Sequence, residues 1–83
     1  MFTLVFNLFF LQELFLKDNQ LQEVPKGVFE LGELRILQLG GNNISQLGGL
    51  GSLASLTNLG LESNRIDSLD PGVFRQNTQL TIL

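Results

Sequence analysis

Apolar residues recur along the chain in one eleven-residue pattern, which is written three times, at residues 11–21, 34–44 and 56–66. In every copy, leucine or isoleucine stands at the first, fourth, sixth and eleventh positions, and asparagine stands at the ninth. A fourth copy starts at Leu80, and successive copies begin 23, 22 and 24 residues apart. A pattern that returns at such a period predicts an array in which each copy builds one structural unit.

The first six residues of each copy alternate between apolar and variable positions, which predicts a short strand with one buried face. Such a short strand is not stable alone, so neighbouring copies must pair as a parallel sheet. The asparagine after each strand can both donate and accept hydrogen bonds inside the turn that follows. We therefore predict a buried ladder of asparagines that satisfies backbone groups of the turns. Its rungs are Asn19, Asn42 and Asn64.

The pattern LxxLxLxxNxL resembles that of the leucine-rich repeat family. This resemblance implies a repeat solenoid of α/β type, a right-handed superhelix with short parallel strands on its concave face. Residues 24–29 and 69–74 resemble the longer, typical class of repeat, in which proline and glycine precede phenylalanine. Residues 47–56 resemble the shorter class, and their glycines disfavour a full helix. Extended or 3-10 turns are therefore expected on the convex face.

The repeats predict a single domain over residues 1–83. The apolar start of the chain could also be a signal-peptide core, but no lysine or arginine precedes it and no small-residue cleavage site follows it. Residues 5–11 instead match residues 28–34 at the 23-residue offset, which favours the second half of a repeat. The predicted division is a partial repeat at 1–10, repeats at 11–33, 34–55 and 56–79, and a partial repeat at 80–83.

The composition argues against catalysis and against most kinds of ligand. The chain has no histidine and no cysteine, so it lacks the commonest general base, a thiolate nucleophile and the usual zinc ligands. It has eight acidic and five basic residues, and the basic residues form no patch that would favour nucleic acid. The apolar start is too short to span a bilayer. We expect no enzymatic activity, no cofactor, no metal and no membrane insertion.

The side chains that alternate with the inward leucines form the outer surface of the predicted sheet. The resemblance implies that this concave face binds a protein or a peptide. Phe15 and Ile36 are large apolar residues where solvent is expected, and aromatic groups on a rigid sheet make good anchors. Isolated exposed apolar residues are also common, so the pattern leaves both interpretations open. The predicted binding residues are Glu13, Phe15, Lys17, Arg35, Ile36, Gln38, Asn58 and Glu62.

Three smaller motifs admit a structural and a functional interpretation. Asn43-Ile44-Ser45 is an N-glycosylation sequon, and the Asn43 side chain is expected to face outward. The pair Gly40-Gly41 could form an anion-binding nest, but a relaxed turn before the ladder asparagine is the preferred interpretation. Asn77 stands where the longer repeat class has leucine, so we expect its amide to be partly exposed or bonded to a local turn.

Receptor-like protein recognition is the predicted function. The alternative is a structural or truncated array, a fragment of a longer receptor or a designed solenoid, with no activity alone. Apolar layers at both ends also predict self-association, unless residues 1–10 fold over the first coil as a cap. The typical-class repeats slightly favour an extracellular location, which the lack of cysteine-rich end caps weakens. The pattern does not identify the partner.

Overall fold

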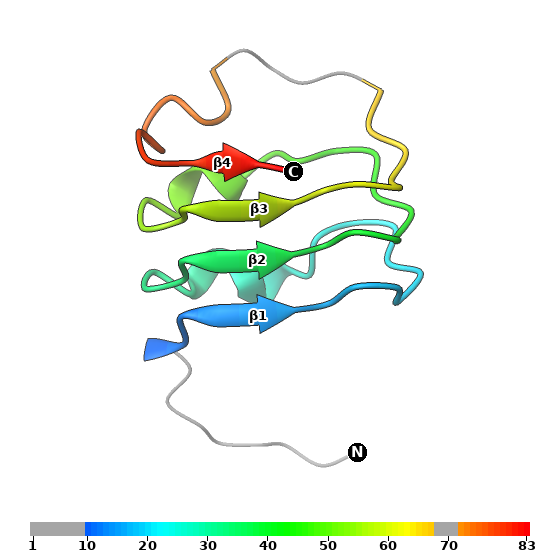
Figure 1. The fold of residues 1–83 in the computed structure, drawn as a ribbon, viewed down its shortest axis with the longest axis horizontal. Coiled ribbons are helices and arrows are strands. Elements are labelled where there is room, and N and C mark those ends of the chain that lie inside the picture. The colour runs from blue at the N-terminus through cyan, green and yellow to red at the C-terminus, as the bar shows by residue number, and fades with distance from the viewer. Residues whose placement is uncertain (1–9, 68–71) are drawn as a thin grey trace.

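A computed structural model describes residues 10–67 and 72–83 of the chain. The sequence features assigned to residues 1–9 and 68–71 lie outside these described residues. Strands and short 3-10 helices alternate from β1 to β3, and β4 is the next element after β3 in the described chain (Figure 1). The elements are β1 (Glu13–Phe15), η2 (Lys26–Glu30), β2 (Ile36–Gln38), η3 (Leu50–Ser52), β3 (Asn58–Gly60) and β4 (Thr81–Ile82).

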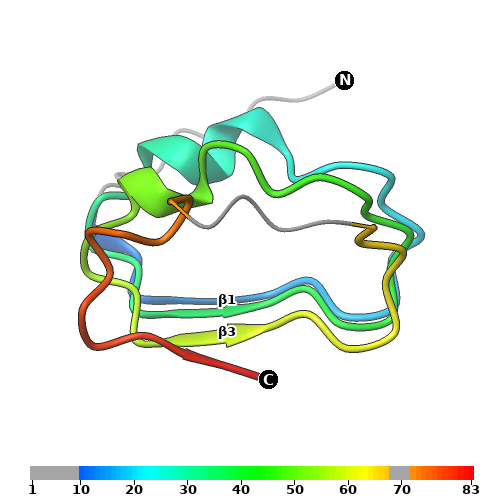
Figure 2. The same cartoon turned by 90° about the horizontal axis from the view of Figure 1, so that it is seen from above.

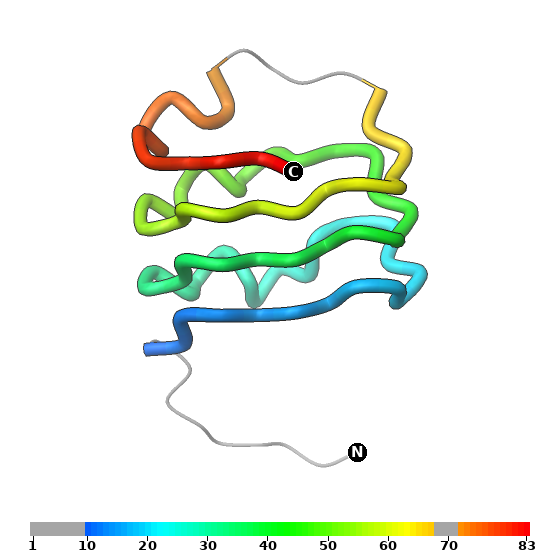
Figure 3. The backbone as a smooth tube through the Cα atoms, viewed as in Figure 1, coloured from blue at the N-terminus to red at the C-terminus, as the bar shows by residue number. Residues whose placement is uncertain are grey.

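The four strands form one parallel sheet in the order β1-β2-β3-β4 (Figure 1). Leu14, Leu37 and Leu59 stand opposite one another across the first three strands. These leucines hold the same position in each copy of the sequence pattern, so the period of the pattern sets the register. The backbone tube in Figure 3 shows the coils running side by side from β1 to β4. The predicted parallel sheet is confirmed, whereas the right-handed twist and the repeat limits stay predictions.

The helices lie on the opposite side of the coils from the sheet (Figure 2). Both are 3-10 helices, in agreement with the expected short turns on this side. Gly49 precedes η3 with a φ of 96°, a conformation that glycine adopts without steric cost. The Phe29 ring packs beside Gly49, 3.1 Å from the place where a Cβ would stand. The helix sides of these two coils have different sequences, and they pack together because the large Phe29 faces the small Gly49.

The hydrophobic core fills the space between the sheet and the helices. Its inner members come mainly from the middle of the described chain, where each coil has a neighbour on both sides. Leu14 and Leu16 of the first coil and Leu61 of the third are only half-buried. Burial of a leucine side chain stabilises by about 1.5–3 kcal/mol, so the middle coil contributes most. The fully buried leucines and isoleucine are Leu34, Leu37, Leu39, Ile44, Leu50, Leu53, Leu56 and Leu59.

Asn77 differs from its prediction, because its side chain is neither exposed nor bonded to a local turn. It is only 6% exposed, and its Nδ2 donates a hydrogen bond of 2.8 Å to the carbonyl oxygen of Leu53 in the preceding coil. Its Oδ1 is buried and has no hydrogen-bond partner among the described residues. Leaving such an oxygen unpaired costs about 1–3 kcal/mol. Asn77 therefore links two coils with only half of its amide satisfied.

Candidate functional site

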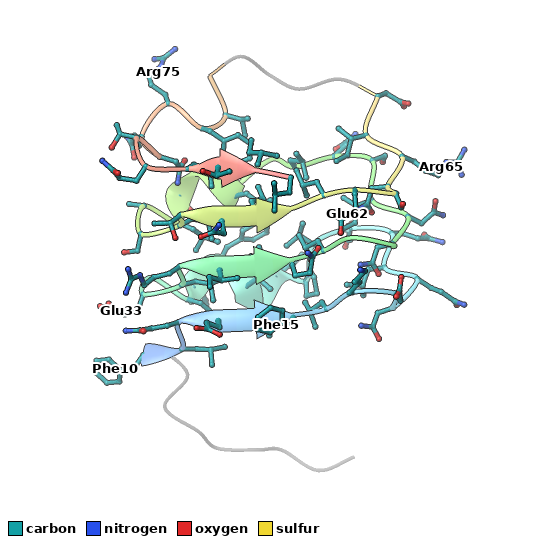
Figure 4. The ribbon with its side chains drawn as sticks, in the orientation of Figure 1. Phe10, Phe15, Glu33, Glu62, Arg65 and Arg75 are labelled. Carbon is teal, nitrogen blue, oxygen red and sulfur yellow. The ribbon has the colours of Figure 1, made fainter. Side chains whose placement is uncertain are left out.

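The outward surface of the sheet, which we call the sheet face, carries the side chains that alternate with the buried leucines. Figure 4 looks onto this face, with Phe15 on β1 and Glu62 just beyond β3. The strand register arranges the outward residues in rows that cross the sheet. Backbone hydrogen bonds continue the same register past the ends of the strands. The rows are Glu13-Ile36-Asn58-Thr81, Phe15-Gln38-Gly60-Leu83 and Lys17-Gly40-Glu62.

Phe15 is the aromatic group of the sheet face, with 61% of its surface exposed, and Leu83 at the other end of the same row is 69% exposed. In the same row, the Gln38 amide lies directly over Gly60, in the space that a Cβ there would occupy. The Gln38 Oε1 accepts a hydrogen bond of 2.6 Å from the backbone N–H of Gly40, which holds the side chain flat. Phe15 therefore has as its neighbour in the row a polar side chain that lies flat on the sheet. Ile36, in the neighbouring row, is partly buried and offers less apolar area.

Two carboxylates lie over the glycine pair at the end of β2. The Glu62 carboxylate occupies the space of a Cβ on Gly40, and the Asp18 carboxylate occupies the space of a Cβ on Gly41. Asp18 and Glu62 come from the coils on either side, so their side chains converge over the central coil. Within residues 10–67 and 72–83, neither carboxylate has a hydrogen-bond or ion-pair partner. Both therefore remain available to an outside donor.

Gly41 has a second role, because it forms the turn that leads to the ladder asparagine. Its φ is 69°, and Asp18 and Ser63 hold the equivalent place in the neighbouring coils with φ of 60° and 58°. All three residues thus have the left-handed conformation that favours glycine. The relaxed-turn interpretation of the glycine pair fits this geometry at Gly41, whereas Gly40 leaves room for the Glu62 carboxylate.

Behind the sheet face, Asn42 ties the first two coils together. Its Nδ2 donates hydrogen bonds of 2.9 Å to the carbonyl oxygens of Leu16 and Leu39. Its Oδ1 accepts hydrogen bonds of 3.0 Å from the backbone N–H groups of Asn19 and Leu21. The side chain is buried, with 8% exposure. One amide thus satisfies backbone groups of two turns and holds neighbouring strands at a fixed distance.

Comparison with known sequences now adds to this geometry. The model of the family described as Leucine rich repeat matches residues 10–66. The chain belongs to the leucine-rich repeat family. Human leucine-rich repeat-containing protein 66 is 35% identical over 75 residues, which cover 88% of this chain. Leucine-rich repeat and fibronectin type-III domain-containing protein 4 is 43% identical over 64 residues, or 72% of this chain, in rat and in mouse alike.

The leucine-rich repeat chain spans only 8% of the human relative and 10% of the rodent one. The family model matches the stretch that contains the three complete copies of the eleven-residue pattern. Proteins of this family commonly act as protein-binding modules and are typically non-enzymatic. Membership therefore supports a protein-binding role for this chain in general terms.

The ladder of this leucine-rich repeat chain is deepest at Asn42 and weaker on both sides. Asn64 is half-buried; its Nδ2 donates to the Leu39 carbonyl at 2.8 Å and its Oδ1 accepts from the Ile44 N–H at 2.9 Å. Asn19, predicted to be a buried rung, is exposed, and its Nδ2 donates to the Lys17 carbonyl at 3.1 Å. The other two rungs each bond the coil before them, Asn42 through the Leu16 carbonyl and Asn64 through the Leu39 carbonyl.

Sequence reasoning placed the eight predicted binding residues on one strand face, and the structure puts all of them on or beside the sheet face. Asp18 and Gly41 were not among the predicted binding residues. The signal was a glycine pair at outward positions flanked by acidic residues at equivalent positions of the neighbouring repeats. Only the close approach of side chains across the coils shows that the glycines make room for these carboxylates.

The helix side carries an open hollow that the sequence did not predict. It is lined by residues of the glycine-rich stretch 45–52 and of the turn 72–76, and none of the predicted binding residues reaches it. In the part of the chain that the structure describes, no three acidic side chains come together as metal ligands. No helix there has the length and apolar character needed to cross a membrane.

Proposed function

We propose that this leucine-rich repeat chain is a non-enzymatic recognition module that binds a protein or a peptide through its sheet face. The observation that carries the proposal is the exposed ring of Phe15 on a paired strand, in the same row as Gln38, whose amide lies flat over Gly60. A large aromatic group on a rigid support gains contact area with little loss of conformational entropy. Such residues dominate the binding energy of many interfaces.

The residues around Phe15 fit the anatomy of a recognition surface. Glu13, Lys17, Arg35 and Asn58 are exposed, so they can form a polar rim around the aromatic ring. Since the backbone beneath them is held by parallel pairing, a partner would meet a surface that is already ordered. The chain's lack of histidine and cysteine supports recognition over catalysis.

Substitution of Phe15 tests this proposal. Phe15→Ser and Ile36→Ser should each weaken binding of a protein partner by roughly 1–3 kcal/mol while leaving the melting temperature nearly unchanged. Lys26→Ala in η2 and Arg75→Ala on the helix side are the controls, and they should alter neither quantity. Calorimetric titration and thermal melts of each variant give the two readouts. A partner whose affinity ignores Phe15 and Ile36 but responds to Lys26 would place the site on the helix side.

A second candidate function is a structural one, in which the chain acts only as part of a longer array. The short share of the relatives that it covers supports this alternative. Binding measured with the isolated chain and abolished by Phe15→Ser would speak against it.

Self-association through the ends is also part of the proposal for the isolated chain. Large apolar side chains are exposed near both edges of the sheet, namely Phe10 (69%), Ile82 (43%) and Leu83 (69%). An unpaired strand at such an edge is a template for pairing. Light scattering over a concentration series should show a rising mass. A concentration-independent monomer that melts cooperatively would overturn self-association.

A further inference from the structure

We infer that the segment bound by the sheet face presents a basic side chain, preferably arginine, within about two residues of an apolar one. This inference rests on the proposed function and specifies the chemistry of its partner. It starts from the two carboxylates of Asp18 and Glu62, which come from different coils and lie over Gly40 and Gly41. No described residue bonds to or neutralises either of them.

The two carboxylates suit a guanidinium group because they lie over adjacent residues, Gly40 and Gly41, and reach them from opposite sides. Asp18 reaches inward from the first coil and Glu62 from the third, and the glycine pair between them has no side chain to block access. A guanidinium carries five donors in a planar fork and can bond two acceptors at once, whereas an ammonium acts as a point charge. Arginine is therefore the preferred basic residue.

The distance from the aromatic ring sets the spacing within the partner. Gly40 lies one strand across and two residues along from Phe15, which is about 8 Å by standard sheet dimensions. Alternate side chains of an extended segment are about 7 Å apart. One extended segment can thus place an apolar side chain against Phe15 and a basic one over the glycine pair. The overall charge of −3 also favours a basic partner.

Lys17 allows an independent test, because it bears a positive charge in the same row as Gly40 and Glu62. It forms no ion pair within the described residues, so it does not neutralise the two carboxylates. Its ammonium should repel a basic partner. Removal of this charge is therefore expected to change binding in the opposite direction from removal of the carboxylates.

The probe is a displayed library of random linear peptides, selected on the full chain and counter-selected against the Phe15→Ser variant. Recovered peptides should be enriched in arginine within two residues of an aromatic or aliphatic residue. With one synthetic peptide from the selection, Asp18→Asn combined with Glu62→Gln should weaken binding roughly three- to tenfold, and added salt should have a similar effect. Lys17→Gln should strengthen binding by up to about threefold. Glu23→Gln combined with Glu30→Gln, which removes two exposed carboxylates away from the sheet face, is the charge-matched control.

The possible outcomes distinguish failure of the basic-partner inference from failure of sheet-face recognition. Peptides that need Phe15 but carry no basic residue, or that bind the Asp18→Asn/Glu62→Gln variant equally well, overturn the inference and leave sheet-face recognition standing. An equal loss with Glu23→Gln/Glu30→Gln also overturns it, since the effect would then come from net charge alone. Failure to recover any peptide that depends on Phe15 counts against the proposed function itself.

Discussion

In the sheet half of the coils, the backbone pairing and the asparagine hydrogen bonds are repeated from coil to coil, whereas in the helix half the side-chain contacts between coils differ from one pair to the next. Asn42 and Asn64 each donate a hydrogen bond to the equivalent carbonyl oxygen of the preceding coil, at Leu16 and Leu39. On the helix side, Phe29 packs against Gly49 in one place, and Asn77 bonds Leu53 in another.

This difference shows two ways of stacking a solenoid. The sheet half uses backbone groups and one asparagine per coil, so its outward side chains can vary without loss of the fold. The helix half depends on the volumes of particular side chains, so a change in one coil must be matched in the next. Recognition residues can therefore change freely on the sheet face, while the helix side constrains its residues pair by pair.

The largest effect is expected in the sheet half, at Asn42. Asn42→Ala should lower the free energy of unfolding by about 3 kcal/mol, because backbone groups of two coils lose their buried partner. Asn43→Ala, one residue later on an exposed side chain, is the control and should cost little. Urea unfolding of both variants measures the difference. Equal shifts would show that the asparagine does not hold the coils together.

The helix half should be broken most readily at Gly51. A Cβ there would collide with the backbone carbonyl oxygen of Val73, which cannot move without shifting the next coil. Gly51→Ala should therefore destabilise the chain by about 2 kcal/mol. Nothing lies within 4 Å of the equivalent atom at Gly48, so Gly48→Ala should have little effect. Thermal melts that fail to separate the two alanines would mean that the helix side adapts more easily than the packing indicates.

Asn77→Leu should make the helix half more like a regular repeat and raise the free energy of unfolding by about 1 kcal/mol. The substitution removes the buried, unpaired Oδ1 and adds apolar contact, and these gains exceed the lost bond to the Leu53 carbonyl. Asn77→Ala, which loses the bond without the added contact, should instead destabilise. Denaturant midpoints of the pair decide the sign, and a less stable leucine variant would show that the inter-coil bond outweighs the unpaired oxygen.

The smallest effect is expected at Ser63, where the sheet half tolerates a left-handed residue other than glycine. Ser63→Gly should stabilise by about 0.5 kcal/mol, because glycine adopts a φ of 58° without strain and this gain exceeds its extra chain entropy. Ser55→Gly is a control outside these positive-φ positions and should be neutral or slightly destabilising. Differential scanning calorimetry resolves such shifts. A destabilised Ser63→Gly variant would indicate that the serine side chain stabilises its turn.

Much of the candidate site followed from the alternation of residues in the strands. Because successive side chains of a strand point to opposite faces, burial of Leu14 requires that Phe15 face outward. The arrangement around Phe15 did not follow in the same way. Gln38 lies flat because Gly60 stands beside it on the next strand, and that contact depends on register and rotamer together.

The sequence alone determined the parallel sheet, the register of β1, β2 and β3 and the place of the asparagines, since each depends on a local pattern that returns along the chain. The register of β4 did not follow, because Thr81 pairs with Asn58, 23 residues earlier, although the copies at Leu56 and Leu80 start 24 residues apart. Tertiary structure alone decided which groups were covered by a neighbouring coil. Asn77 is buried because Leu53 lies one coil away, and Asn19 is exposed although it holds the same sequence position as Asn42. The physical reason is that periodicity specifies direction along one coil, whereas burial and hydrogen-bond partners come from the coils stacked on either side.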